Sequence, residues 1–163
     1  MEGRVRIKLL VSLQPGLHLR ELQRQIGLSF SSTRYHVDKL AKDGEIDRVE
    51  DSGYSRIYPA GIGQGDRILL SLVRKETDRR ILSSFLKENS LSQQRLTDLT
   101  KLAKSTVSEH LATLLKLGVV RTKAGGERRI FELTDQAKIY TMLNRYPHLL
   151  SKATRRFIDL WDF

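Results

Sequence analysis

The sequence predicts a mostly α-helical fold with small β-hairpins, in which a unit of three helices and one hairpin occurs twice and is followed by C-terminal helices. Three observations predict this fold class. The chain contains an ungapped internal repeat, its apolar residues recur at helical spacing, and a segment of strand-like alternation follows the third helix of each copy.

The repeat keeps one register at an offset of 74 residues. The segment LSFSSTRYHVDKLAKDGEI at 28–46 aligns with LAKSTVSEHLATLLKLGVV at 102–120 without a gap. His36 falls on His110 and Gly44 falls on Gly118, while apolar positions fall on apolar positions. Chance does not supply so many matches in one register, so we interpret the repeat as an internal duplication.

The first copy contains three apolar stripes at helical spacing, separated by QPG at 14–16 and GLS at 27–29. Ser29 is expected to cap the third helix, and Gly44 is expected to end it in a left-handed conformation. The segment 45–59 alternates around DSG and predicts a β-hairpin. The stripes consist of Ile7, Leu10 and Val11, then Leu19, Leu22 and Ile26, then Thr33, Val37, Leu40 and Ala41.

The second copy repeats this order. Ser92 is expected to cap its second helix, and a hairpin is expected at 119–133 around AGGE. Its stripes consist of Ile81 and Phe85, then Leu96 and Leu99, then Val107, Leu111 and Leu114.

The remaining segments define the expected domain boundaries. A glycine-rich hinge at 61–65 precedes a connector helix at 67–76; the hinge either adjusts the spacing of the domains or is locked by that helix. Thr134 is expected to cap a helix that extends to about Tyr146, and Pro147 to open a final helix. The expected parts are a first domain at 1–60, a hinge and connector at 61–76, a second domain at 77–133 and a helical tail at 134–163.

The composition bounds the environment and the partner. The formal net charge of +10 favours a polyanionic partner, either nucleic acid or an anionic membrane. The chain contains no cysteine, which excludes disulfides and thiolate metal sites. Charges at the N-terminus and the shortness of every apolar run predict a soluble intracellular protein, cytoplasmic and associated with the nucleoid.

Each copy resembles a winged helix-turn-helix domain of the type found in ArsR- and MarR-like regulators. The resemblance is carried by HLRELQRQIGLSFSSTRYHVDKLAKDGEI and LTKLAKSTVSEHLATLLKLGVV, and most specifically by STVSEHL at 105–111. The whole plan resembles a group of archaeal tandem winged-helix transcription regulators. This resemblance implies sequence-specific binding of double-stranded DNA, with helices 30–43 and 104–117 in major grooves, and it implies no cofactor.

The candidate DNA-binding residues lie at the start of each expected recognition helix and in the second hairpin. Short hydroxyl side chains let a helix N-terminus approach phosphates and base edges, and cations of a wing grip the backbone. Serines at such positions also serve simply as caps, and basic hairpins are also ordinary solvated surfaces. The candidates are Ser31, Ser32, Arg34, Tyr35, Lys39, Lys104, Ser105, Thr106, Ser108, Arg121, Lys123, Arg128 and Arg129.

The two copies differ in charge. Residues 1–66 have a net charge of +1 and residues 67–133 a net charge of +7. The first hairpin is acidic, whereas the second has four cations, with Glu127 as the only acid expected near them. We therefore expect the second copy to supply most of the phosphate affinity. The first copy is expected either to read bases through Arg34 and Tyr35 or to hold a protein surface.

Metal binding and catalysis have little support. None of the four histidines has a second histidine or a carboxylate at the spacing of a helical metal pair, so His36 and His110 are expected to be structural. The GIGQG segment is followed by no lysine, so it is not a phosphate-binding loop of the P-loop type. We expect neither a bound metal nor enzymatic activity.

Two partner hypotheses remain open. Leu150, Ala153, Phe157, Leu160 and Trp161 form an apolar stripe that either covers the second domain's core or pairs two chains in a homodimer suited to an inverted-repeat site. Contacts with the transcription machinery are also compatible with a regulator. The alternative function is a tandem winged-helix scaffold for protein interactions in a transcription or chromosome-associated complex.

Overall fold

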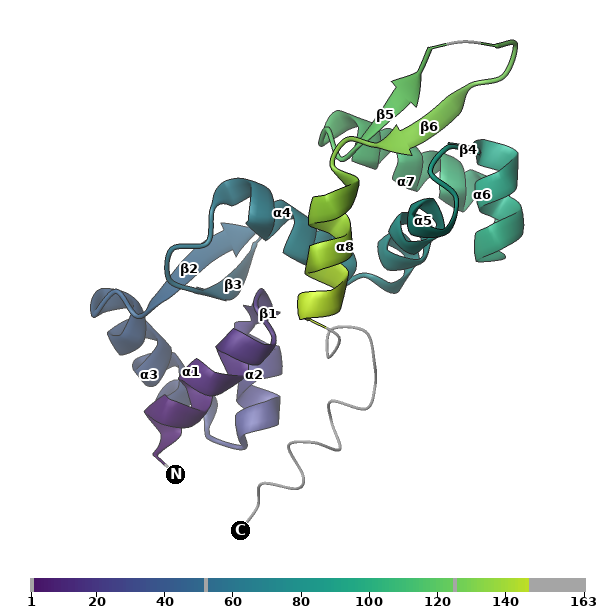
Figure 1. The fold of residues 1–163 in the computed structure, drawn as a ribbon. Coiled ribbons are helices and arrows are strands. Elements are labelled where there is room, and N and C mark those ends of the chain that lie inside the picture. Colours follow the sequence, from purple (N-terminus) through teal and green to yellow (C-terminus); the bar gives the residue numbers. More distant parts are fainter. Residues whose placement is uncertain (1, 52, 125, 147–163) are drawn as a thin grey trace. The chain divides into compact units, whose positions relative to one another are not determined.

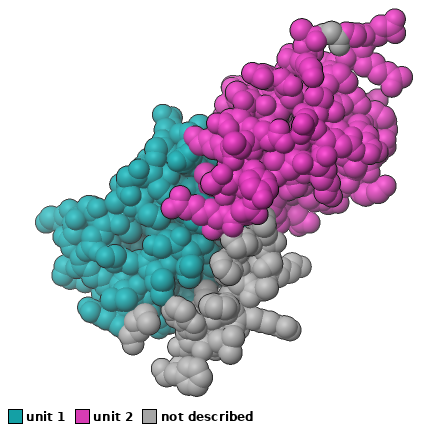
Figure 2. All heavy atoms as spheres, viewed as in Figure 1, with its two compact units in different colours: residues 1–71, 146–163 teal, residues 72–145 magenta. Residues whose placement is uncertain are grey.

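The structure, a computed structural model, describes residues 2–51, 53–124 and 126–146. The chain before residue 72 forms one compact unit, and residues 72–145 form another (Figure 2). Both contain the same order of three helices and a hairpin, with one helix following each hairpin (Figure 1). The mostly α fold with two hairpins and the internal duplication are therefore confirmed.

The first unit contains the elements α1 (Gly3–Leu13), β1 (Leu17–His18), α2 (Leu19–Ile26), α3 (Phe30–Lys42), β2 (Ile46–Asp51) and β3 (Tyr54–Pro59). Helix α4 (Gln64–Val73) follows, and the division between the units falls within it. The second contains α5 (Glu76–Lys87), β4 (Leu91–Ser92), α6 (Gln93–Thr100), α7 (Lys104–Lys116), β5 (Val120–Lys123), β6 (Ile130–Leu133) and α8 (Gln136–Arg145).

Each hairpin belongs to a three-stranded antiparallel sheet. In the first unit β3 is central, with Ile46 opposite Pro59 in β2 and Leu17 opposite Ile57 in β1. In the second unit β6 is central, with Val120 opposite Leu133 in β5 and Leu91 opposite Phe131 in β4. The sequence predicted both hairpins but missed β1 and β4, the short third strands.

The predicted apolar stripes form the two cores. In the first unit Ile7, Leu22, Val37 and Leu40 are fully buried together with Ile57 of the hairpin. The second unit has the equivalent arrangement. Its fully or almost fully buried side chains include Ile81, Phe85, Leu96, Val107, Leu111, Leu114 and Phe131. Helix α8 packs against α5. Burying a side chain of this size contributes about 1.5–3 kcal/mol, so these stripes account for why helices of 8–13 residues are stable here.

The predicted helix ends are mostly confirmed. The Ser29 side chain accepts a hydrogen bond from the Ser32 N–H at 3.1 Å, and Ser92 accepts one from the Arg95 N–H at 3.1 Å. Gly44 has a φ of +71°, in the left-handed region that glycine adopts without strain.

Two predicted helix boundaries are wrong. Asp135, not Thr134, caps α8, because its Oδ1 accepts a hydrogen bond from the Lys138 N–H at 3.0 Å and the helix begins at Gln136. The connector helix occupies Gln64–Val73 rather than 67–76. Gly65 is accommodated in its first turn, where one glycine costs only about 1 kcal/mol. The expected helix after Pro147, with the apolar stripe from Leu150 to Trp161, lies outside the described residues.

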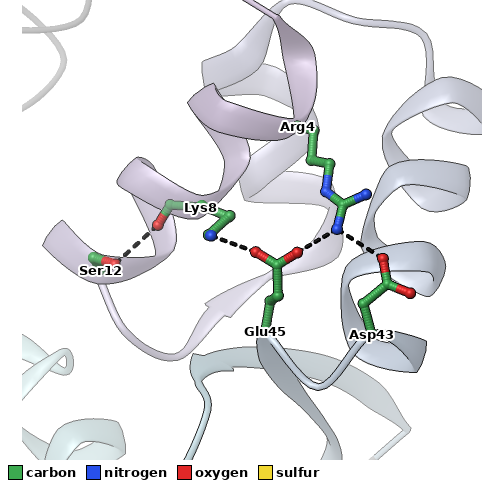
Figure 3. Close-up of polar contacts among 5 residues, drawn as sticks. All are labelled: Arg4, Lys8, Ser12, Asp43 and Glu45. Carbon is green, nitrogen blue, oxygen red and sulfur yellow. Dashed lines mark hydrogen bonds and ion pairs between the residues drawn. The ribbon is translucent and has the colours of Figure 1, made fainter.

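An ionic network closes the first unit between α1 and the turn before β2 (Figure 3). The Arg4 guanidinium binds the Asp43 carboxylate at 2.7 Å and also the Glu45 carboxylate, which in turn binds the Lys8 ammonium. The hydrogen bonds from Lys8 and then Arg4 lower the pKa of Glu45 below its usual value. Ion pairs therefore connect α1 to the end of α3 and the following turn in this unit.

The equivalent positions of the second unit are largely apolar. Lys8 corresponds to Leu82, Asp43 to Leu117 and Glu45 to Val119. Leu82 is fully buried and Val119 nearly so, whereas Leu117 is 41% exposed, so packing replaces the contact of Lys8 with Glu45 but not the contact of Asp43. The same backbone plan is thus closed by two different kinds of interaction.

Candidate nucleic-acid interface

The helix-turn-helix of the first unit consists of α2, the turn at 27–29 and α3. Gly27 ends α2 in a left-handed conformation with a φ of +75°, and its N–H donates to the Gln23 carbonyl at 3.1 Å. Thr33 is fully buried, and its hydroxyl donates to the Ser29 carbonyl at 2.9 Å. This arrangement holds the first turn of α3 against the core and leaves its outer face in solvent.

The five candidate residues of α3 are all exposed: Ser31, Ser32, Arg34, Tyr35 and Lys39. They are not equally free. The Ser29 hydroxyl donates to the Ser32 hydroxyl at 2.9 Å, so Ser32 takes part in the cap. Arg34 lies 3.7 Å from the Asp38 carboxylate one turn later. Tyr35 has 61% of its surface exposed, and its ring lies against the His36 ring with centroids 5.5 Å apart.

The helix-turn-helix of the second unit consists of α6, the turn at 101–103 and α7. Lys101 ends α6 with a φ of +57°, at the position that Gly27 occupies in the first unit. It is the one non-glycine residue with a positive φ in the part of the chain that the structure describes. A long cationic side chain is thus held in a conformation that favours glycine, directly before α7.

The N-terminus of α7 has no side-chain cap from any described residue. Ala103 occupies the cap position that Ser29 occupies in the first unit, and its methyl group accepts no hydrogen bond. The side chains of Lys104, Ser105 and Ser108 are exposed, and Thr106 is half-buried. Open N–H groups, the positive end of the helix dipole and an adjacent lysine together favour an anion at this end.

The second hairpin presents its cations unevenly. Arg121 pairs with Glu132 directly across the strands at 2.8 Å. The expectation that Glu127 is the only nearby acid is therefore wrong, because the β5–β6 register places Glu132 opposite Arg121. Arg129 lies over the Phe131 ring, 5.3 Å from its centroid. The hairpin projects from the helices of its own unit (Figure 1).

Lys123 and Arg128 are exposed cations of the same hairpin. No carboxylate among residues 2–51, 53–124 and 126–146 lies within ion-pair distance of either side chain. Lys104 of α7 is unpaired in the same sense. These three cations are available to an external anion without breaking an ion pair among the described residues.

The first hairpin has the opposite character. The Arg48 guanidinium binds the Asp38 carboxylate at 2.6 Å and lies 3.6 Å from Glu50, and Arg56 binds Asp51 at 2.7 Å. Because Asp38 also faces Arg34, this one carboxylate of α3 is shared by a cation on the helix and a cation on the hairpin, and Glu50 lies beside the latter as a second acid. The cations of the first hairpin are therefore ion-paired, whereas Lys39 of α3 and Arg20 of α2 have no ion pair among the described residues.

Sequence reasoning missed two residues near the start of α3. Phe30 is the first residue of that helix, and 45% of its surface is exposed. The Arg20 guanidinium of α2 lies over its ring, 6.0 Å from the centroid. The position of Phe30 directly after a predicted cap was the available signal, but an aromatic ring there does not suggest a contact with phosphate.

Other classes of site have no support among the described residues. They contain no group of three or more histidine, aspartate and glutamate side chains placed to hold a metal ion. His110 contacts the buried carboxylate of Asp78 instead, with Nδ1 2.6 Å from Oδ1. None of the helices described is long and apolar enough to span a bilayer.

Comparison with known families matches each unit separately. Residues 1–70 match a family described as an N-terminal HTH domain. Residues 74–121 match a family described as winged helix-turn-helix DNA-binding. The second match covers α5, β4, α6, α7 and the first two residues of β5, whereas Lys123, Arg128 and Arg129 of the second hairpin lie beyond it.

One curated relative and two solved structures illustrate the similarity. An uncharacterised HTH-type transcriptional regulator of Methanocaldococcus jannaschii is 31% identical over 121 residues, which are 74% of this chain and 30% of that protein. The match therefore spans less than a third of the relative's length. Reduced HlyU of Vibrio cholerae aligns with a TM-score of 0.44 at 28% identity, over 50% of this chain and 88% of that one. A MarR family transcriptional regulator of Silicibacter pomeroyi aligns with a TM-score of 0.42 at 21% identity, over 60% of this chain and 65% of that one.

The duplication, the sheet behind each pair of helices and the two family matches lead to one assignment. Both halves carry the helix-turn-helix and the hairpin, and the relative described above, of which the match spans 30%, is named an HTH-type transcriptional regulator. The chain consists of two tandem winged helix-turn-helix units.

Proposed function

We propose that the protein is a sequence-specific transcription regulator that binds double-stranded DNA and works by occupying its site. Helices α3 and α7 enter major grooves with their N-terminal turns toward the base edges, and the second wing grips the phosphate backbone. The observation that carries this proposal is the open N-terminus of α7 together with Lys104, Lys123 and Arg128 of the same unit, cations that no described carboxylate pairs.

The second unit supplies most of the phosphate affinity in this proposal. Ser105 and Thr106 place short side chains and uncapped N–H groups at the start of α7. Lys104 and Lys123 attract phosphate directly, since neither must first release a carboxylate of the described chain. Arg121 is proposed as a weaker contact because Glu132 already occupies it. The Arg129 guanidinium lies over the ring of Phe131, and we propose that it contacts phosphate from there.

In this proposal the first unit contributes more to the recognition of bases than to the affinity for phosphates. Its exposed residues Ser31, Arg34, Tyr35 and Lys39 project from α3, but Asp38 offsets the charge of Arg34. The internal ion pairs of the first wing leave that wing unsuited to a phosphate backbone. Contacts to base edges in the groove determine sequence specificity, whereas phosphate contacts fix the position of the protein on the duplex.

A second candidate function rests on the same first wing. A winged-helix unit whose cations are internally paired is also suited to a protein partner, so a protein-interaction scaffold is the alternative. The two candidates differ at α7. Substitution of Ser105 and Thr106 by alanine weakens a DNA binder, whereas a scaffold tolerates that change at the start of the helix.

The experiment that tests the proposal is fluorescence anisotropy of the purified full chain on labelled mixed-sequence duplex DNA, from low to physiological salt. We expect log affinity to fall linearly with log salt, with a slope that corresponds to roughly four or more phosphates at about 0.9 per contact. Absence of binding even at low salt contradicts DNA binding and favours the scaffold. A flat salt dependence contradicts the proposed grip on the backbone.

Homodimerisation remains a prediction, because the apolar stripe that suggests it lies outside the described residues. Light scattering coupled to size-exclusion chromatography checks it directly. A dimer matches the symmetry of an inverted-repeat site, whereas a monomer requires a direct or asymmetric site.

A further inference from the structure

The first residue of the helix-turn-helix's second helix differs in kind between the units. In the first unit it is Phe30, and at the equivalent position of the second unit it is Lys104. Both follow the cap position directly, and both side chains are exposed. The duplication holds the backbone the same, so the side chain at this one position changes what the helix offers to a groove: a cation in one unit and an aromatic ring in the other.

Phe30 is not part of the core. The core side chains of α3 are Thr33, Val37 and Leu40, all fully buried, whereas 45% of Phe30 is exposed. Its ring is covered on one side by the Arg20 guanidinium of α2 at 6.0 Å. Leaving an aromatic ring half in water is unfavourable for a free protein, since its apolar area is not removed from solvent. The exposed 45% of its surface remains available for contact with a ligand.

The surroundings of Phe30 favour an apolar feature of DNA over its phosphates. On the same helix, Arg34 faces Asp38, and Asp38 also holds Arg48 of the hairpin. Tyr35, five residues after Phe30, adds a second exposed ring with 61% of its surface in solvent. The N-terminal part of α3 therefore presents two aromatic rings among hydroxyls and the paired Arg34, with the unpaired Arg20 of α2 beside Phe30, where α7 presents a lysine that no described carboxylate pairs.

The major groove contains one apolar group that an aromatic side chain recognises, the C5 methyl of thymine. We propose that Phe30 is a specificity-determining residue that contacts a thymine methyl group, so that the first unit selects A·T pairs while the second unit holds the backbone. This inference rests on the proposed binding of double-stranded DNA. It adds the base that the first unit reads and names a residue outside the DNA-binding set derived from the sequence.

The test replaces single thymines by deoxyuridine, which pairs with adenine in the same way and lacks only the methyl group. A binding site is first enriched from a randomised duplex library with the full chain, and each thymine of that site is then replaced in turn. Affinity is measured by anisotropy for the wild type, for Phe30→Ala and for Phe30→Lys. Tyr140→Ala serves as the control, because Tyr140 is an exposed aromatic residue of α8, outside both helix-turn-helix segments.

We expect at least one replacement to weaken wild-type binding about fourfold, the loss that corresponds to leaving one methyl-sized group unburied. Phe30→Ala is expected to bind the two forms of that site equally, while Tyr140→Ala retains the wild-type difference. Phe30→Lys is expected to remove the same difference and to steepen the salt dependence, since it installs the residue of the second unit. Because Phe30 is half-exposed, both variants are expected to fold, which circular dichroism verifies.

The outcomes separate this inference from the proposed function. If a site is enriched but no replacement changes wild-type affinity, thymine reading is overturned while DNA binding stands. A methyl effect that persists unchanged in Phe30→Ala and Phe30→Lys also overturns it, because the methyl is then read elsewhere. If no site is enriched and DNA does not bind at low salt, the proposed function fails and this inference fails with it; a protein partner then explains the aromatic face of α3.

Discussion

His110 of α7 places its Nδ1 atom 2.6 Å from Oδ1 of Asp78, a carboxylate of α5 that is only 3% exposed. This contact joins the first and third helices of the second unit. The equivalent residues of the first unit, Arg4 and His36, do not repeat it: Arg4 binds Asp43 and Glu45 instead. The duplicated histidine is thus part of a buried polar contact in one copy only.

Removal of the His110 ring is therefore expected to destabilise the second unit more than the equivalent change destabilises the first. His110→Ala deprives the buried Asp78 carboxylate of this partner, at an expected cost of about 1–3 kcal/mol in the free energy of unfolding. His36→Ala is the matched control, and we expect a cost below about 1 kcal/mol for it. Urea unfolding of both variants measures the difference. Equal costs would show that the pairing with Asp78 contributes nothing specific.

The ionic network of the first unit predicts an acid-labile interaction. Hydrogen bonds from Lys8 and then Arg4 lower the folded-state pKa of Glu45 below its ordinary value of 4.5. A lowered folded pKa means that the carboxylate stabilises the fold at pH values above 4.5 and that this contribution disappears as the pH falls through the folded pKa. We expect Glu45→Gln to remove this part of the pH dependence below about pH 4.5. Unfolding midpoints of the variant and the wild type that stay parallel over about pH 3–6 would contradict this role.

The backbone of Lys101 predicts a stabilising substitution. Its φ of +57° is unfavourable for a residue with a Cβ atom, and the first unit has Gly27 at the equivalent position. We expect Lys101→Gly to raise the free energy of unfolding by about 0.5–1 kcal/mol, since relief of strain outweighs the added freedom of the unfolded chain. Ala112→Gly, a change at an exposed position in the middle of helix α7, is the control and should destabilise by about 1 kcal/mol. The midpoint of urea unfolding gives the sign of each effect.

The uncapped end of α7 predicts opposite effects on stability and DNA affinity. Ala103→Ser adds the cap that Ser29 provides in the first unit and is expected to stabilise the second unit by about 0.5–1 kcal/mol. The new hydroxyl occupies N–H groups that we propose for phosphate, so DNA affinity is expected to fall. Ser29→Ala makes the reverse change in the first unit and is expected to lower stability. Anisotropy and thermal unfolding on the same samples test both expectations, and an Ala103→Ser variant with increased affinity would argue against phosphate at this helix end.

The second wing is expected to dominate the salt dependence of DNA binding. Arg128→Ala combined with Arg129→Ala should lower affinity and reduce the slope of log affinity against log salt by about 0.9 for each phosphate that the variant no longer binds. Lys75→Ala combined with Lys87→Ala removes the same charge from exposed positions outside the helix-turn-helix and the wing. Equal slopes for these two double variants would show that only the overall charge matters.

The sequence was sufficient for the elements whose pattern is local. The apolar stripes that include Ile7, Leu22 and Val37 predicted helices because the spacing of each stripe is visible within one short stretch of sequence. β1 and β4 were missed because two residues carry no period, and they are strands only through pairs such as Leu17 with Ile57, which lie far apart in the chain. Helix α8 begins one residue later than predicted because Thr134 and Asp135 are both good caps, and only the backbone geometry selects Asp135.

The exposure of the candidate site could be predicted, but its electrostatics could not. A helix with Thr33, Val37 and Leu40 inward must direct Ser31 and Tyr35 outward, and the structure places them there. Which cations are neutralised depends on contacts between elements. Asp38 meets Arg48 only when the hairpin packs beside α3, and Glu132 meets Arg121 only in the register of β5 and β6. Counts of charge along the chain do not contain that information.

Every strand described in a repeat pairs with a strand of the same repeat: β1 and β2 with β3, and β4 and β5 with β6. A repeat built in this way contains the pairing partners of all its described strands. Duplication of such a segment in a gene therefore adds a second domain without changing the strand pairing of the first. Later substitutions, such as those that left Phe30 in one repeat and Lys104 at the equivalent position of the other, then affect one repeat only. We interpret the chain as the product of one duplication, after which each repeat could change independently because it pairs its described strands without the other.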